Sequence, residues 1–337
     1  MSVVTALTTL VRGTRHKSRL SWQWIALFLA PALVFYCLFI IVPVAMTFFN
    51  SVNKLQILGA SGIRYTFVGF QNYNILIPQP ELTLNPANMT FGFIPFTLVW
   101  GDDIFRQAVE HSLVWGFVSP IFDIPFALVL AYALYLKVPF TRFFRFAWFT
   151  PMLISWVVVG IMFRWIYNYE WGAVNVVLRG VGLGSLAVDW LGRTDTALPA
   201  LIVMGMWKFL GFNLILMLAA ISSVPVDLVD AARIDGCNWR QILWSIVLPL
   251  VRVTAVNLAI LDFMGKMKAF AEVWVTTNGG PVYHTETVAT YMQKRAFDWQ
   301  TLDLGYPSAI AVLWFIVVFG LAVLFQRILQ RREIVEF

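Results

Sequence analysis

Long apolar runs separated by short polar segments are the dominant pattern along this chain. A helix that crosses the hydrocarbon core of a bilayer needs about 20 consecutive, mostly apolar residues. The runs of this length predict six membrane-spanning helices, at 22–46, 111–136, 147–167, 197–221, 250–271 and 306–326. The first run outlasts the roughly 7–15-residue apolar core of a signal peptide and lacks a small-residue cleavage site, so we interpret it as a retained span.

These runs divide the chain into regions. Glycines and prolines recur among aromatic side chains between the first two runs, which is typical of an irregular external segment. We therefore expect an all-α membrane protein with a basic N-terminus, a first transmembrane helix, an external segment, a five-helix core and a short tail, at 1–21, 22–50, 51–106, 107–326 and 327–337.

The polar segment 222–249, between the fourth and fifth runs, predicts two short helices joined by a turn. Leu228, Ala231 and Ala232 follow i, i+3, i+4 spacing and give the first helix a face of small residues, on which another surface can approach closely. Gly236 supplies the left-handed residue that ends this helix. The pattern predicts a helix-turn-helix outside the membrane.

The second helix of this unit has its own start signal. Asn238, followed three residues later by Gln241, has the pattern of a capping box. Pro249 then predicts the start of the fifth span. Taken alone, such a unit could be a simple connector between two spans.

The external loop after the fifth run also predicts a short helix. The sequence from Asn278 to Pro281 is Asn-Gly-Gly-Pro, which we expect to end the fifth span sharply. Thr285 can cap a helix on which Val288 and Tyr291 share one apolar face. That face suits either the membrane surface or ordinary packing within a loop.

Composition and charge place these elements in a bilayer and orient them. Hydrophobic residues make up 60% of the chain and charged residues 12%, against about a quarter in soluble domains. Thirteen Lys and Arg residues fall on the side of the two termini, and seven fall on the other side. By the positive-inside rule both termini are expected in the cytoplasm. The net charge of +6 then reflects orientation and not nucleic-acid binding, which needs a contiguous basic face.

Residues for catalysis, redox chemistry or metal binding are sparse. Cys37 and Cys237 lie in different regions, and the three histidines are isolated, so no metal-ligand spacing exists. The sequence has no G-x-x-x-x-G-K-[ST] phosphate cradle. We therefore expect no catalytic residue, no metal and no cofactor on this chain, and any ATP has to bind to another chain.

Charged residues inside the apolar runs are the strongest candidate functional groups. A charge at the centre of a membrane helix costs about 2.5–3.5 kcal/mol on insertion scales, so such residues face a bundle interior or a watery cavity. Asp262 and Lys266 are four residues apart on one face, and Lys208 lies in the fourth run. They could line a pathway or form a salt bridge between helices, or Lys266 and Lys268 could extend towards the membrane surface.

The sequence DAARIDG at 230–236, followed by LP at 248–249, resembles the EAA loop of the permease subunits of bacterial ABC importers. Asp230 takes the place of the usual Glu. Five more segments resemble the sugar-importer branch that includes the maltose-type permeases: FLAPALVFYCLFIIVP, FVGFQNY, WKFLGFNLILMLAAISSVP, VWVTTNGGP and GYPSAIAVLWF. The external segment departs from that branch at about 78–101, where it is longer.

The resemblance implies the ABC type I importer permease architecture in the inner membrane of a bacterium. It implies a second homologous permease, two ATPase subunits that bind ATP and Mg, an external solute-binding protein, contact with membrane lipid and a sugar-type substrate. It assigns ATPase coupling, through a helix seated in a groove of the ATPase, to Asp230, Ala231, Ala232, Asp235, Gly236 and Pro249. By alignment it assigns the substrate pathway to Met152, Lys208, Phe212, Asp262 and Lys266.

Two other classes of protein compete with this interpretation. A secondary transporter or channel would need no ATPase, and copurification of an ATPase would exclude it. An intramembrane enzyme would need clustered catalytic residues, which the sequence does not contain.

Overall fold

The structure is a computed structural model that describes residues 22–57, 63–77, 79–82, 96–99, 101–136, 138–297 and 303–330. The basic N-terminus, most of the external segment at 78–101 and the end of the tail lie outside these ranges. The chain divides into two compact units, Met1–Phe49 and Asn50–Phe337. Most of the described residues are helical, as the apolar runs predict.

The first unit holds the first predicted span. α2 (Trp22–Tyr36), the π-helical turn η1 (Cys37–Ile41) and α3 (Val42–Ser51) follow one another without a break. The stretch Ala26–Ser51 is long and apolar enough to cross a membrane. Large apolar side chains are exposed along the whole of it, which is typical of a helix whose solvent is lipid.

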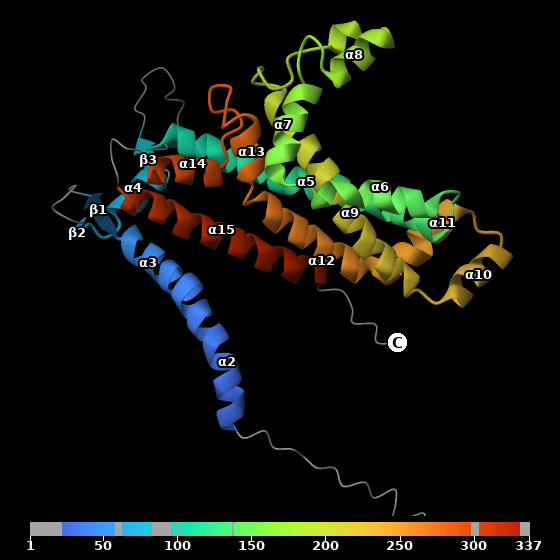
Figure 1. Ribbon diagram of the computed structural model, residues 1–337, viewed down its shortest axis with the longest axis horizontal. Coiled ribbons are helices and arrows are strands. Elements are labelled where there is room, and N and C mark those ends of the chain that lie inside the picture. Colours follow the sequence, from blue (N-terminus) through green and yellow to red (C-terminus); the bar gives the residue numbers. More distant parts are fainter. Residues whose placement is uncertain are drawn as a thin grey trace, which may run out of the picture. The chain divides into compact units, whose positions relative to one another are not determined.

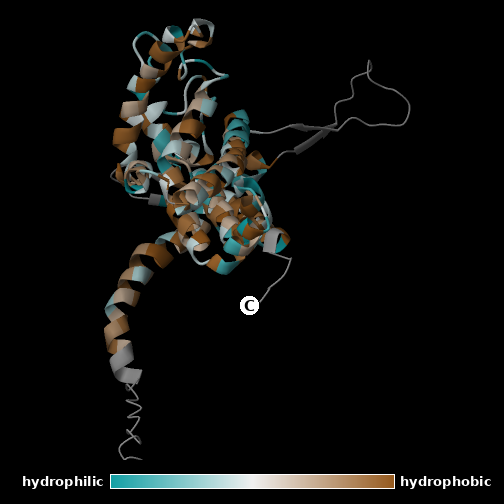
Figure 2. Ribbon diagram, turned by 90° about the vertical axis from the view of Figure 1, so that its right-hand side faces the viewer, coloured by the Kyte–Doolittle hydropathy of each residue, from teal (hydrophilic) through white to brown (hydrophobic). Residues whose placement is uncertain are grey.

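Four long helices form the body of the second unit (Figure 1). They are α5 (Asp103–Tyr135), α9 (Ala197–Ser222), α12 (Leu248–Lys266) and α15 (Gly305–Gln330). α5 packs on α9 and α12, and α12 also packs on α9 and α15. Hydrophobic residues cover these helices on their outer sides as well (Figure 2). Among the described residues, five helices are long and apolar enough to cross a membrane, or six if one bent pair counts as a span.

That bent pair covers the third predicted span, 147–167, which is thus broken in the middle. α6 (Thr141–Leu153) and α7 (Trp156–Ile166) meet at an angle of 106°. Pro151 lies in the last turn of α6, and Ser155 is extended, with φ −64° and ψ 152°. The Ser155 hydroxyl accepts a hydrogen bond from the Val158 N–H and so starts a new helix. Local capping therefore favours a break where hydropathy alone predicts continuity.

The fifth span also differs from its prediction. α11 (Trp239–Ile242), the π-helical turn η5 (Leu243–Val247) and α12 form one continuous helix from Trp239 to Lys266. Pro249 thus lies within a helix and does not start one. The π-helical turn directly before it accommodates a residue that cannot donate a backbone hydrogen bond. The span ends at Lys266, well before Asn278, and α13 (Ala271–Thr276) follows.

The predicted helix-turn-helix is present. α10 (Val226–Ile234) ends at Gly236, whose φ is +81°, and the capping box of Asn238 and Gln241 starts α11. Both helices lie at one end of the second unit, opposite β1 and α4 (Figure 1). Ala232 packs into the buried core, whereas Ala231 is exposed. The two alanines predicted to share one outer face therefore have different environments.

The opposite end carries short strands and helices. β1 (Asn53–Ile57) pairs antiparallel with β2 (Ile63–Phe67), with Asn53 opposite Phe67, and β3 (Gln79–Leu82) pairs antiparallel with β4 (Phe96–Val99). The short helices α4 (Gln71–Leu76) and α14 (Val288–Ala296) complete this end, whereas a third short helix, α8 (Ala173–Gly180), and the 3-10 turn η4 (Gly184–Leu186) lie beyond α7 (Figure 1). None of the three helices is long enough to span a bilayer.

The cap of α14 is Thr287, not the predicted Thr285. Thr287 and Thr290 form the capping box, while the Thr285 hydroxyl donates to the Gly280 carbonyl. The apolar face with Val288 and Tyr291 is buried in a cluster shared with α5, α12 and α15. This face therefore packs inside the protein and does not lie on the membrane surface.

We predict that Gly211 is required for the contact of α9 with α6. A β-carbon at this position would lie 2.2 Å from the Trp148 carbonyl oxygen and 2.8 Å from the Phe149 Cα, and these backbone atoms cannot move aside alone. Gly211→Val should destabilise the protein by about 1–3 kcal/mol through overpacking. Thermal unfolding of the purified protein measures this. Gly320→Val on α15 is the control, because a β-carbon at Gly320 would have no neighbour within 4 Å; equal midpoints for both variants would contradict the prediction.

Candidate functional site

A cavity of about 300 Å³ lies among α9, α12, α13 and the start of α7. Trp156, Phe209 and Phe212 give it aromatic walls. Its polar lining comes from Asn213, Asp262, Lys266, Lys268 and Glu272. Of the residues predicted for a substrate pathway, the structure brings three to this cavity: Phe212, Asp262 and Lys266. Met152 and Lys208 do not line it.

Lys266 is buried, with 3% of its surface exposed. Its Nζ donates to the Gly205 carbonyl at 3.1 Å and lies 4.5 Å from the centre of the Phe209 ring. Within the described ranges no carboxylate lies within 4.0 Å of this Nζ, so the proposed salt bridge with Asp262 is not formed. Lys266 does not extend to the membrane surface either. A backbone carbonyl and an aromatic face stabilise its charge instead.

Asp262 contacts a residue that the sequence analysis missed. Asp123 on α5 lies close enough for its carboxyl group to interact with that of Asp262, and both residues are buried. The signal was available in the sequence, since Asp123 is an acidic residue inside an apolar run, between Pro120 and Pro125.

Lys208 binds the backbone at the break between α6 and α7. Its Nζ donates to the carbonyl oxygens of Pro151, Met152 and Ile154, at 3.4, 3.0 and 2.6 Å. The C-terminus of a helix leaves carbonyls unpaired and carries partial negative charge, so a buried ammonium group is well matched to it. Lys208 therefore holds the bend, and Met152 contributes its carbonyl. Trp156, directly after the bend, forms a wall of the cavity.

Glu272 is a second polar residue of the cavity that the sequence analysis missed. It lies in the first turn of α13 and is almost completely buried. The expected span 250–271 ends one residue before Glu272, so this residue was not among the candidate charges inside the apolar runs. The earlier end of α12 at Lys266 brings it into the site.

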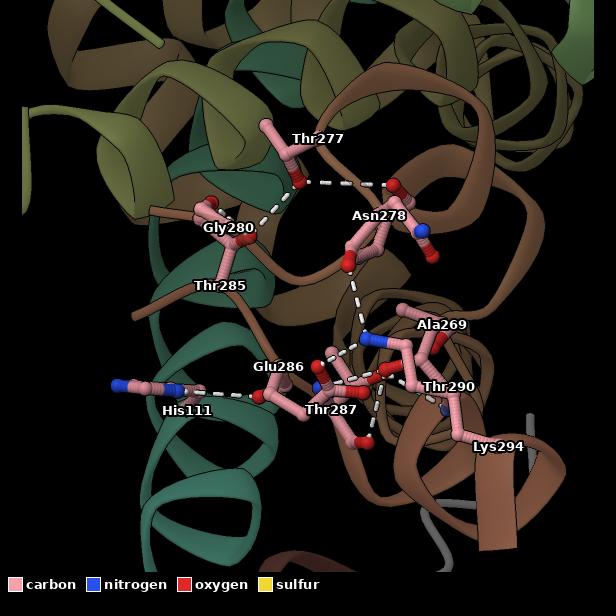
Figure 3. Close-up of polar contacts among 11 residues, drawn as sticks. His111, Ala269, Thr277, Asn278, Gly280, Thr285, Glu286, Thr287, Thr290 and Lys294 are labelled. Carbon is pink, nitrogen blue, oxygen red and sulfur yellow. Dashed lines mark hydrogen bonds and ion pairs between the residues drawn. The ribbon is translucent and has the colours of Figure 1, made fainter. Parts of the chain in front are cut away.

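The loop between α13 and α14 is fixed by a polar network (Figure 3). Glu286 is fully buried, and Lys294 Nζ lies 2.6 Å from its carboxylate and 2.8 Å from the Asn278 carbonyl oxygen. The Glu286 carbonyl oxygen lies 3.0 Å from His111 Nδ1 on α5. Gly279 has a φ of +83°, and a β-carbon there would collide with the Glu286 carboxylate. The loop beside the cavity is thereby held in one conformation.

A second network joins the start of α5 to α14 and α15. The Asp102 carboxylate accepts hydrogen bonds from the Tyr291 and Tyr306 hydroxyls and from the Phe105 N–H. Burial raises the pKa of Asp102, but these hydrogen bonds lower it more, so its net pKa lies below the ordinary value. The group is therefore ionised at neutral pH and joins α5, α14 and α15 where their ends meet.

The comparisons with known proteins agree with this architecture. The profile of the family described as "binding-protein-dependent transport system inner membrane component" matches residues 123–335. The chain is similar to the probable ABC transporter permease protein YurN of Bacillus subtilis, with 30% identity over 88% of this chain and 93% of that protein. It is also similar to the sulfoquinovosyl glycerol transport system permease protein SmoG of Agrobacterium fabrum, with 28% identity over 91% of this chain and 90% of that protein.

One solved structure shows the same fold. It is a crystal structure of a bacterial ABC transporter involved in the import of the acidic polysaccharide alginate. The TM-score is 0.71 at 19% identity, and the match covers 94% of this chain and 96% of that chain. The long helices and the bent pair described above thus belong to a known membrane architecture.

We predict that Lys208 acts on the backbone and not on a ligand. Lys208→Met leaves three carbonyl groups at the bend without their donor, which should destabilise the protein by about 1–3 kcal/mol. Lys208→Arg keeps a cationic donor and should recover part of this loss. Thermal unfolding of the purified protein measures both variants. Lys268→Met, at an exposed position, is the control. An unfolding midpoint unchanged by Lys208→Met would contradict the assignment.

Proposed function

The chain belongs to the family of binding-protein-dependent transport system inner membrane components, and from this premise we propose that it carries a sugar or sugar derivative through the membrane in an ATP-driven importer. The relative SmoG, named for transport of sulfoquinovosyl glycerol, supports a carbohydrate substrate. The observation that carries the proposal is the cavity between α9, α12 and α13.

The lining of this cavity suits a carbohydrate. A sugar ring has an apolar face of C–H groups and a rim of hydroxyls. The aromatic faces of Trp156 and Phe212 can stack on the C–H face of the ring. Asn213 and Asp262 can exchange hydrogen bonds with its hydroxyls. Buried polar groups that need partners make such a site selective, because a ligand without hydroxyls leaves them unpaired.

The proposal includes the partners that such an importer needs. A second, homologous permease would complete the pathway, two ATPase subunits would bind ATP and Mg, and an external solute-binding protein would deliver the substrate. To swing the permeases from 1:99 to 99:1 between two states, ATP has to favour one state by about 5.5 kcal/mol. The positive-inside rule supports a cytoplasmic location for both termini and for α10 and α11.

In this proposal α10 and α11 are the contact with an ATPase. Leu228, Ala231 and Ile234 are exposed on α10, and Ile234 is 86% exposed. The acidic residues Asp230 and Asp235 flank this apolar surface. Ala232 faces the core and would seat α10 on the spans, whereas Pro249 lies inside the helix that follows. An exposed apolar surface on a short helix suits a groove on another protein.

The first test of the function concerns the cavity. Phe212→Ala removes a stacking face and should raise the half-saturation for carbohydrate uptake by about three- to tenfold. Lys266→Gln should change the half-saturation or the preference among carbohydrates, because a charge at the wall is lost. Both are measured as ATP-dependent uptake by the assembled complex in vesicles, with protein amounts compared. Phe315→Ala, at an exposed position on α15, is the matched control. Reduced protein amounts with unchanged half-saturation and selectivity would count against the cavity.

The second test concerns coupling. Gly236 and Gly182 have φ values of +81° and +79°, and neither has a neighbour within 4 Å of its β-carbon position. Valine at either position therefore brings the same backbone strain, of about 1 kcal/mol or more. We expect Gly236→Val to lower transport severalfold at unchanged protein amount, and Gly182→Val, in the loop after α8, to leave it unchanged. Normal transport by Gly236→Val would refute the coupling role of this turn.

A further inference from the structure

Three polar residues lie along one stripe of α5, where the bundle is most tightly packed. Trp115, Ser119 and Asp123 are four residues apart, so their side chains follow one another along the helix. Their exposed fractions are 0%, 0% and 1%. Trp115 Nε1, Ser119 Oγ and Asp123 Oδ2 nevertheless have no hydrogen-bond partner among the described residues. We call these three residues the α5 stripe.

Two more unpaired polar atoms lie on the helices that pack against α5. They are Asn213 Nδ2 on α9 and Asp262 Oδ2 on α12, both on buried residues. We call the contact between α5, α9 and α12 the seam. A β-carbon at Gly205 would lie 3.3 Å from both Lys266 Nζ and the Trp115 ring, which places α9, α12 and α5 together at one level. Asp123 and Asp262 lie near each other further along the contact of α5 with α12.

An unpaired polar group in a tight helix contact destabilises the state in which it is unpaired. The same stripe continues with Ala127 and Ala131, both fully buried, so α5 can meet its neighbours there with small apolar residues. α5 carries one more buried polar atom without a partner among the described residues, the Tyr132 hydroxyl, further along the helix. The three atoms of the α5 stripe differ from it in lying beside Asp262 and Lys266, which line the cavity, so partners reached from the cavity in another state of the protein would stabilise them.

The chemistry of the five atoms defines the partner. Trp115 and Asn213 offer N–H donors, the two carboxyl oxygens accept, and the Ser119 hydroxyl can do both. A metal ion would be repelled by the N–H groups, and an apolar ligand would leave all five unpaired. Water and the hydroxyl groups of a carbohydrate both donate and accept. Asn213 and Asp262 already line the cavity, so the seam is continuous with it.

We propose that the α5 stripe is a further wall of the carbohydrate pathway, covered here by α9 and α12 and opened to water and substrate in the other transport state. The inference rests on the proposed function for the identity of the substrate. The opening of the seam can be measured separately from that identity. In the opened state the indole N–H, the Ser119 hydroxyl and the Asp123 carboxyl hydrogen-bond with water or sugar hydroxyls.

The first experiment measures access to the seam. Ser119→Cys is placed in a chain in which Cys37 and Cys237 are replaced by Ser, and the assembled complex is treated with a charged methanethiosulfonate reagent. Reaction rates are compared without nucleotide, with ATP and with vanadate-trapped nucleotide. We expect at least about tenfold faster reaction in one of these states. Ala127→Cys, on the same stripe and equally buried, is the control and should react slowly in all of them.

The outcome separates this inference from the proposed function. If the complex takes up carbohydrate while Ser119→Cys stays as unreactive as Ala127→Cys in every state, the α5 stripe is not a wall of the pathway. The proposed transport of carbohydrate is then unaffected. If carbohydrate is not taken up but Ser119→Cys shows state-dependent reaction, the seam opens as proposed and the substrate assignment fails.

A second variant tests contact with substrate. Trp115→Phe removes the indole N–H and keeps an aromatic side chain. If this N–H binds the substrate or its water shell, the half-saturation for carbohydrate uptake should rise by about three- to tenfold at unchanged protein amount. If the N–H is unpaired in every state, its removal should leave the half-saturation unchanged and the protein equally or more stable. That second result would overturn the role of Trp115.

Discussion

The membrane portion of this protein is organised by the need to stabilise charges away from water. Lys208 binds three carbonyl oxygens, Lys266 binds one carbonyl and lies over an aromatic ring, and the buried Asp123 lies beside Asp262. Each of these contacts holds two helices together, because the partner of the charged residue lies on a different helix. A charge left without such a partner in the bilayer would cost about 2.5–3.5 kcal/mol or more. The bend of α6 and α7, the cavity and the polar seam are consequences of this constraint.

One continuous helix connects the cavity to the end of the second unit that carries α10 and α11. The continuous helix from Trp239 to Lys266 begins at the Asn238 cap, directly after the Gly236 turn, and carries Asp262 and Lys266 at its far end. A rigid helix transmits a tilt at one end to the other. On the proposed function, movement of α10 and α11 by an ATPase would therefore shift Asp262 relative to Asp123 and open or close the seam beside α5.

Local chemistry explains what the sequence could predict. The apolar runs located the spans, and Gly236, Asn238 and Gln241 specified the turn between α10 and α11, because those signals act over a few residues. The bend between α6 and α7 has local signals as well, Pro151 and the Ser155 cap, but hydropathy did not show it, and its stability also depends on Lys208, more than 50 residues away along the chain. The contact of Asp123 with Asp262 is equally non-local. Thr285 and Thr287 offered the same local capping chemistry, and packing of Val288 in the core favoured the second.

The central claim is that carbohydrate passes the cavity between α9 and α12, and photo-cross-linking from its wall tests this most directly. A benzophenone amino acid replaces Phe212 in the assembled complex, which is illuminated during ATP-driven uptake, and peptides containing position 212 are analysed by mass spectrometry. The account predicts a carbohydrate adduct that requires ATP and the solute-binding protein. A complex that still transports carbohydrate but yields only lipid or protein adducts at this position would contradict it.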